Sequence, residues 1–441
     1  MAIVFATACP ARSTAAHQED LLVATGTTSI TSDTPLPDTA RAQRRILIVL
    51  VSAQILSGAG LAAGITVGAL LAQDMLDSTS LAGLPSALFT AGSALAAVAV
   101  GRLSQARGRR PGLAAGYLTG AIGSLGVIAA AVLNNLALLF IALFVYGAGT
   151  ATNLQARYAG ADLATASHRG RAVSTVLVAT TLGGVIGPNL AAPTGGLAQS
   201  LGIPYLAGPF LLAAAAYALA ALVLAVSLRP DPLLLARELG TTDAATTQTA
   251  PVDDSGKGIA AGGLVMALTQ LVMVAIMTMT PVHMHAHGHS TAAAGLVIAI
   301  HVGAMYLPSP LTGWLVDRYG RLPVAAASGV TLLAAGLLAA AAPGDSMVLL
   351  ALALTLLGLG WNLGLVAGTA IITDTVPLAT RAKTQGAVDV SIAVAGATGG
   401  MGSGLMVAAT SYPALALAGG VLAVAVVPIA AFTGFSRSAS R

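Results

Sequence analysis

Apolar runs of about 20 residues, the length that crosses the hydrocarbon core of a bilayer, recur along most of this 441-residue chain. Only 8% of the residues are charged and 56% are hydrophobic, whereas soluble proteins carry roughly 25% charged residues. A soluble globular fold is therefore excluded, and the sequence predicts an all-α polytopic membrane protein. The net charge of +4 comes from dispersed basic residues, so no nucleic-acid partner is expected and the partner is the lipid bilayer.

The apolar runs form two groups of six, which predicts 12 transmembrane helices. The first six are expected near 46–72, 82–103, 112–133, 136–158, 172–195 and 206–228, and the second six near 259–281, 291–313, 324–342, 346–372, 384–410 and 413–435. The predicted parts are a disordered cytoplasmic tail at 1–41, a six-helix bundle at 42–228, a flexible cytoplasmic linker at 229–258 and a second bundle at 259–436.

The basic residues predict the orientation. All 20 Lys and Arg fall in the tails, the linker or alternate loops, and we assign Arg157 to the loop after 136–158 together with Arg169 and Arg171. Loops rich in Lys and Arg remain in the cytoplasm. Both termini are therefore predicted to be cytoplasmic, in a multi-pass monomer of the cytoplasmic membrane.

The two groups repeat at a fixed offset of 212 residues. An internal repeat of this kind predicts two pseudo-symmetric bundles with a substrate site between them, near the middle of the membrane. The matched positions are Gly101, Leu103, Gly108, Arg109 and Pro111 with Gly313, Leu315, Gly320, Arg321 and Pro323, and Asp162, Arg169 and Arg171 with Asp374, Arg381 and Lys383.

The repeated loops carry a recognisable motif. GWLVDRYGRLP at 313–323, and less completely GRLSQARGRRP at 101–111, resemble the cytoplasmic loop motif of the major facilitator superfamily. The resemblance implies a gating role for these loops, although Gln105 stands where the family motif has an acid. The residues to which it assigns this role are Gly101, Arg109, Asp317, Arg318, Gly320 and Arg321.

Methionine and histidine gather in one stretch of the second bundle. Met273 with Met277, and His301 with Met305, are each four residues apart, which places each pair on one face of a helix. Thioether and imidazole groups suit soft metal ions such as Cu(I). A buried histidine in a membrane helix is also more often functional than a methionine, which is usually a packing residue. The four residues form a candidate metal site.

This ligand set resembles that of the CcoA-type copper importers, bacterial members of the same superfamily. The resemblance implies uptake of copper across the cytoplasmic membrane by alternating access, with copper as the substrate and no cofactor. It also implies a cytoplasmic copper acceptor as a partner. Unlike some members of that group, this chain has one cysteine, Cys9, so histidine and methionine would have to suffice as ligands.

Four alternating histidines lie between the two pairs, at His283, His285, His287 and His289. We expect them in an outer loop after a helix that ends near Pro281. Such tracts bind transition-metal ions, so capture of metal for transport is one interpretation. A pH sensor and simple loop composition are the alternatives.

A few polar residues interrupt the apolar runs. Gln54, Asn153 and Asn362 are expected to line the central cavity. Asp389 is expected near the cytoplasmic side, either as a proton relay or as an interfacial acid paired with Arg381 or Lys383.

A second function is compatible with the same architecture. The Gly and Pro residues of the fifth run resemble the motif of drug/proton antiporters in the superfamily, which implies proton-coupled efflux of drugs or other small organic molecules. Enzymatic activity is not expected, because the sequence has no nucleophile arrangement, carboxylate pair or nucleotide-binding loop. The Gly and Pro residues of the fifth run that resemble the antiporter motif are Gly183, Gly184, Gly187, Pro188 and Pro193.

Overall fold

The computed structural model describes residues 39–76, 84–246 and 255–431. The predicted tail at 1–41 lies outside the described residues except for its last three positions. Residues 247–254 of the predicted linker and 432–436 of the second bundle also lie outside them. The described part of the chain is helical and contains no β-strand, which confirms the predicted all-α class.

The repeat is visible in the order of the helices. The first half contains α1 (Thr39–Leu76), α2 (Leu84–Arg107), α3 (Arg109–Val132), α4 (Leu136–Ala161), α5 (Arg169–Ser200), the 3-10 turn η1 (Tyr205–Ala207) and α6 (Gly208–Ser227). After α7 (Pro232–Thr246), the second half contains α8 (Ser255–Ala286), α9 (Thr291–Tyr306), α10 (Ser309–Tyr319), α11 (Arg321–Ala341), α12 (Met347–Thr375), α13 (Arg381–Ala409) and α14 (Tyr412–Ala423).

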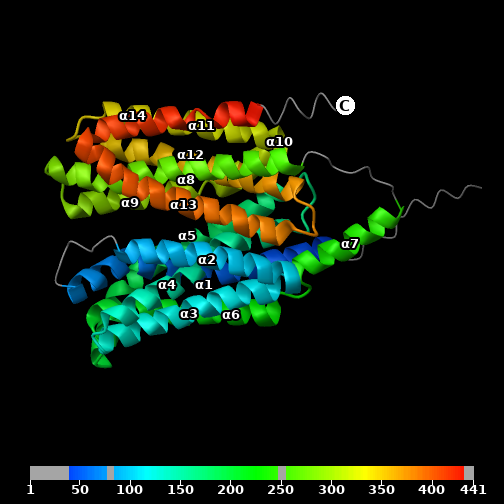
Figure 1. Cartoon of the computed structure of the whole chain (residues 1–441), viewed down its shortest axis with the longest axis horizontal. Helices are drawn as coiled ribbons and strands as arrows, with labels where there is room; N and C mark the ends of the chain where they lie inside the picture. The colour runs from blue at the N-terminus through cyan, green and yellow to red at the C-terminus, as the bar shows by residue number, and fades with distance from the viewer. Residues whose placement is uncertain (1–38, 77–83, 247–254, 432–441) are drawn as a thin grey trace, which may run out of the picture. The chain divides into compact units, whose positions relative to one another are not determined.

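The helices of the two halves form two groups (Figure 1), and each half has its own apolar core. In the first half, α3 packs against α4 and α6, and α2 packs against α4. The equivalent pairs in the second half are α11 with α12 and α14, and α9 and α10 with α12. Large apolar side chains such as Leu405, which is 75% exposed, point outward, as the lipid-facing surface of a membrane bundle requires.

Eleven described helical segments are long and apolar enough to cross a membrane, and α5 brings the number to twelve if it counts as one bent span. α5 bends by 51° between Gly184 and Asn189. The span predicted at 291–313 consists of two helices, α9 and α10, which are separated near Pro308 because proline cannot donate the next helical hydrogen bond.

The helix that carries the methionine pair is longer than predicted. α8 continues through Pro281 and includes His283 and His285, so the expectation that the helix ends near Pro281 is wrong. A proline removes only one backbone donor, and membrane helices tolerate it. α8 stops just before Gly288, whose φ of +84° is a left-handed conformation that glycine adopts without strain.

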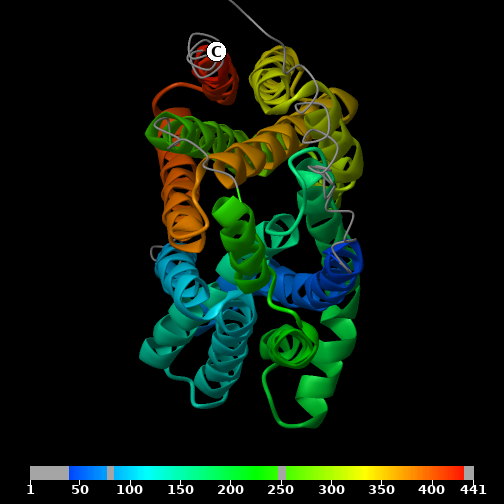
Figure 2. The same cartoon turned by 90° about the vertical axis from the view of Figure 1, so that its right-hand side faces the viewer.

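The linker predicted to be flexible contains a helix, α7, in its described part (Figure 2). The carboxylate of Asp231 accepts hydrogen bonds from the backbone N–H groups of Leu233 and Leu234, at 3.0 and 3.2 Å, and so caps the helix. The other oxygen of Asp231 accepts from the N–H of Arg110 at 2.7 Å. The start of α7 is therefore fastened to the start of α3.

Candidate functional site

Two side chains of the repeated loops cap helices of the opposite half. Gln105 Oε1, at the end of α2, accepts hydrogen bonds from the backbone N–H groups of Ala382 and Lys383 at 2.8 and 3.3 Å. Its Nε2 donates to the carbonyl oxygens of Leu378 and Ala379. α13 has no side-chain cap of its own. Gln105 therefore satisfies exposed donors at the start of α13.

Asp317 does the same for α5. Its two carboxylate oxygens accept from the N–H groups of Gly170 and Arg171 at 2.8 and 3.0 Å, and α5 also lacks a side-chain cap of its own. Asp317 lies 212 residues after Gln105, the offset of the repeat. Gln105 thus performs the capping role that an acid performs in the other copy, because only an acceptor oxygen is required.

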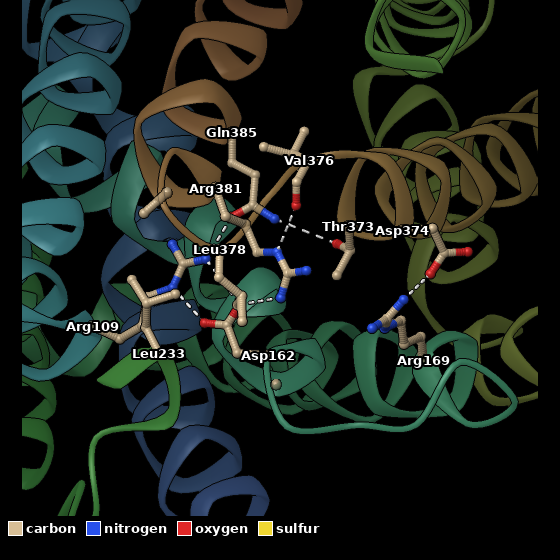
Figure 3. A network of polar contacts seen from close by, with 12 residues as sticks. Arg109, Asp162, Arg169, Leu233, Thr373, Asp374, Val376, Leu378, Arg381 and Gln385 are labelled. Atoms are coloured by element: carbon tan, nitrogen blue, oxygen red, sulfur yellow. Dashed lines mark hydrogen bonds and ion pairs between the residues drawn. The ribbon is translucent and has the colours of Figure 1, made fainter. Parts of the chain in front are cut away.

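Ion pairs within and between the halves surround Asp162 and Asp374 (Figure 3). Arg109 Nε is 2.7 Å from Asp162 Oδ2, and the same guanidinium donates to Gln385 of α13. Arg381 Nη1 of α13 lies 4.0 Å from Asp162 Oδ1. Asp162 is therefore held by one arginine of its own half and one of the other.

The second copy repeats this arrangement. Arg321 Nε is 2.5 Å from Asp374 Oδ2, and Arg169 of the first half also pairs with Asp374. We call these residues and caps the inter-half network: Gln105, Arg109, Asp162, Arg169, Asp317, Arg321, Asp374, Arg381 and Gln385. Arg318, the remaining charged residue of the predicted gating motif, is exposed on α10.

Glycines allow the two halves to meet at this network. A Cβ on Gly101 would lie 2.8 Å from the carbonyl oxygen of Ala382 and 3.0 Å from the Cα of Gly386. A Cβ on Gly313 would lie 2.5 Å from the carbonyl oxygen of Gly170. Gly320, with φ +97°, forms the turn that directs α11 away from α10. Close backbone contact explains why both motif copies begin with glycine.

A second, deeper ion pair joins α4 to α13. Arg157 Nη2 donates to Asp389 Oδ1 at 2.7 Å, and both side chains are buried. The Nε of Arg157 donates to Thr369 Oγ1 of α12 at 2.9 Å. Asp389 lies one helical turn beyond Gln385, so this pair lies about 6 Å further along α13 than the inter-half network.

This pair corrects two expectations from the sequence. Arg157 is a buried residue of α4 rather than part of the following loop. Asp389 pairs with Arg157 of the other half rather than with Arg381 or Lys383 of its own helix. A helix can bury a basic residue near its end when an acid of another helix reaches it, and the sequence does not reveal that acid.

The predicted metal ligands lie in the interior of the second half. Met273, Met305 and His301 are buried, Met277 is partly buried, and the three methionines pack in one apolar core. His301 Nδ1 donates to the carbonyl oxygen of Leu354 at 2.8 Å. His301 Nε2 is buried and has no hydrogen-bond partner.

Among the four histidines after Met279, the structure brings His283 and His287 together, with ring centroids 4.3 Å apart. The ring of His283 stacks on Tyr412 with centroids 4.3 Å apart, and His287 Nδ1 bonds the carbonyl oxygen of His283. His289 Nε2 donates to the carbonyl oxygen of Gly344, and His285 is exposed. Within the described ranges, no three His, Cys, Asp or Glu side chains are placed to hold a metal ion.

Comparison with known proteins decides the family. The family model described as Major Facilitator Superfamily matches residues 48–262 and 262–440. The chain belongs to the major facilitator superfamily. It is therefore a multi-pass membrane transporter, as the motif and repeat predicted, and not an enzyme.

Proteins similar to this superfamily member include two bacterial transporters and one human transporter of known structure. An uncharacterized MFS-type transporter, YdeG, of Bacillus subtilis strain 168 is 56% identical and covers 88% of this chain and 91% of its own length. The riboflavin transporter RfnT of Brucella anthropi is 32% identical over 79% of this chain and 86% of its own. The human organic anion transporter MFSD10 has the same fold, with a TM-score of 0.72, 16% identity and coverage of 88% and 99%.

Two of the predicted cavity residues of this superfamily member belong to a buried cluster that joins α1, α3, α4 and α5. Gln54 Nε2 donates to the carbonyl oxygen of Asn153 and to Thr180 Oγ1, both at 3.1 Å, and Tyr117 donates to Gln54 Oε1 at 2.6 Å. Asn153 Nδ2 donates to Ser57 Oγ at 2.8 Å. The Gln54 amide and the Asn153 Nδ2 therefore have hydrogen-bond partners inside this cluster.

Asn362, the third predicted cavity residue, holds the break between α9 and α10. Its Nδ2 donates to the carbonyl oxygen of Met305 and to Ser309 Oγ, both at 2.7 Å. Its Oδ1 accepts from Thr312 at 2.6 Å. Asn362 therefore satisfies a carbonyl that loses its helical partner where α9 ends.

Sequence reasoning missed Arg157 as a residue of the interior. One signal was available, because Arg157 lies 212 residues before Thr369, so the hydrogen-bonded pair occupies equivalent positions of the two halves. A basic residue at a position whose equivalent is a small polar residue inside a span indicates an interior arginine.

Proposed function

We propose that this transporter moves a small organic solute across the cytoplasmic membrane by alternating access. The observation that carries the proposal is the set of contacts by which Arg157 and the inter-half network join the two halves at one end of the bundle. These contacts are polar and meet across glycines, so they can separate and re-form as whole surfaces. The similarity to a riboflavin transporter supports an organic substrate.

The test is transport in cells at matched membrane expression, with riboflavin and other planar organic compounds as labelled solutes. Wild type is expected to change the cellular content of at least one of them. Gly313→Leu is expected to abolish this change, because the side chain meets Gly170 and Ser174 of α5. Gly295→Leu is the control, since nothing lies within 4 Å of a Cβ there. Equal transport by both variants would contradict the proposal.

Copper uptake is a second proposed function, and one observation favours it. The Nδ1 of His301 faces a carbonyl oxygen, which can only accept, so Nδ1 carries the proton and Nε2 keeps its lone pair. Histidine ligands of metals characteristically donate their other ring N–H in this way. Met305 lies one turn further along α9 and Met273 lies in the same core, which supplies soft sulfur donors.

Copper accumulation at low external copper tests this second function. Copper uptake predicts that His301→Ala and the double variant Met273→Ala with Met277→Ala lose accumulation. Met401→Ala is the matched control, because Met401 is 66% exposed on α13 and is not one of the proposed ligands. If the His301 variant accumulates copper like wild type, these residues serve packing and the organic solute remains the proposed substrate.

A further inference from the structure

The guanidinium of Arg157 is satisfied largely by its own helix. Nη1 donates to the carbonyl oxygen of Leu154, and Nη2 donates to the hydroxyl of Tyr158 at 2.9 Å. The guanidinium carbon also lies 4.2 Å from the centroid of the Tyr158 ring, a favourable cation–π contact. These contacts remain with Arg157 when α4 moves relative to α13.

The carboxylate of Asp389 depends on the other half. Oδ1 accepts hydrogen bonds from Arg157 at 2.7 Å and from Tyr158 at 3.2 Å, and both donors belong to α4. Oδ2 is buried and has no hydrogen-bond partner. In the described structure, α13 itself supplies no donor to this carboxylate.

The two charges therefore respond differently to separation of the halves. Arg157 keeps a carbonyl, a hydroxyl and an aromatic ring, whereas Asp389 loses every donor it has. An unpaired carboxylate in an apolar bundle is strongly disfavoured unless it takes up a proton. Separation of α4 from α13 is consequently linked to the protonation of Asp389.

We propose that Asp389 is the proton-binding site that couples ion movement to opening of the bundle at this end. A proton from water adds to Oδ2, the Arg157–Asp389 ion pair breaks, and the halves separate with a neutral carboxyl group on α13. When the halves close again, Arg157 re-forms the pair and the proton leaves to water. This coupling rests on the proposed alternating access, and it does not depend on which solute is carried.

The surroundings of Asp389 contain few other groups that can titrate. Arg157 and Tyr158 face it from α4, and Arg109 of α3 acts on it electrostatically. The stretch of α2 near Gly386 of α13, residues 97–101, has no ionisable side chain. The stretch of α8 that packs on α13, residues 258–271, also has no ionisable side chain. In α14 the one ionisable residue is Tyr412.

The experiment measures opening directly and needs no solute. Spin labels are attached through Ala106→Cys and Thr380→Cys, both exposed positions beside the inter-half network, in a Cys9→Ser background. The distance between the labels is measured in lipid nanodiscs between about pH 5 and pH 8. The proposal predicts that acidification raises the long-distance population severalfold.

Three variants decide the outcome. Asp389→Asn is expected to give a large long-distance population that no longer depends on pH, and Asp389→Glu is expected to restore the pH dependence. Asp162→Asn, in the inter-half network, is expected to favour opening while the pH dependence persists. The proposal is overturned if wild type does not respond to pH, if Asp389→Asn responds like wild type, or if Asp162→Asn abolishes the response.

Discussion

Asp389 Oδ1 of α13 lies 2.7 Å from Arg157 Nη2 of α4, an ion pair between buried residues that are 232 positions apart in the sequence. The pair adds a second layer of charge behind the inter-half network, and it is the deeper of the two along α13. Two layers of separable polar contacts at one end of the bundle are what an alternating-access transporter needs to close that end and open it again.

Removing one partner of this pair is expected to destabilise the protein strongly. Arg157→Met leaves Asp389 buried without its cation, which typically costs about 3–5 kcal/mol. The double variant Arg157→Met with Asp389→Leu removes both charges and is expected to recover most of that loss. Thermal unfolding in detergent measures both. A double variant less stable than Arg157→Met would contradict the pairing.

The cap supplied by Gln105 is expected to depend on its acceptor oxygen and not on its neutrality. Gln105→Leu leaves the N–H groups of Ala382 and Lys383 without an acceptor and should cost about 0.5–2 kcal/mol. Gln105→Glu keeps the acceptor, places a negative charge at the start of α13 and should cost less. Unfolding temperatures of the two variants compare them, and equal losses would show that the acceptor oxygen is not what stabilises this contact.

Close contact at Gly386 is expected to be required for closure of the motif end. In Gly386→Ala, the Cβ would lie 2.5 Å from the carbonyl oxygen of Ala97, a clash that costs about 1–3 kcal/mol in a packed interior. The distance between labels at positions 106 and 380 should lengthen. Gly402→Ala, on the same helix with nothing within 4 Å of the Cβ, should leave the distance unchanged.

Asn362 is expected to be a structural residue. Asn362→Leu leaves the carbonyl oxygen of Met305 and the hydroxyls of Ser309 and Thr312 without their partner, and a buried unsatisfied group costs about 1–3 kcal/mol. The variant should therefore unfold at a lower temperature than wild type. If it unfolds like wild type but loses solute binding, Asn362 faces the substrate instead.

The linker helix α7 is expected to loosen when its cap is removed. Asp231→Ala deletes the acceptor for Leu233, Leu234 and Arg110, at a cost of about 1 kcal/mol. Hydrogen exchange should accelerate several-fold at the amides that begin α7 and α3. Asp243→Ala, in the same helix beyond its first turns, is the control and should leave those amides unchanged.

Much of this architecture is readable in the sequence. Apolar runs of membrane length predict the helices, and the offset that matches Gly101 with Gly313 and Arg109 with Arg321 predicts two equivalent halves. The motif around Asp317 indicates the family. These features are local or periodic, because a bilayer imposes length on each helix separately and a duplication leaves a constant spacing.

The partners across the halves are decided by tertiary structure alone. Gln105 differs from the acid of the motif, yet it caps α13 as Asp317 caps α5, and only the packed helices show that an acceptor oxygen suffices. The sequence places Arg157 beside a loop and Asp389 beside two basic neighbours, Arg381 and Lys383. Because electrostatic pairing in an apolar interior depends on distance in space, the packing of α4 against α13 selects Arg157 as the partner.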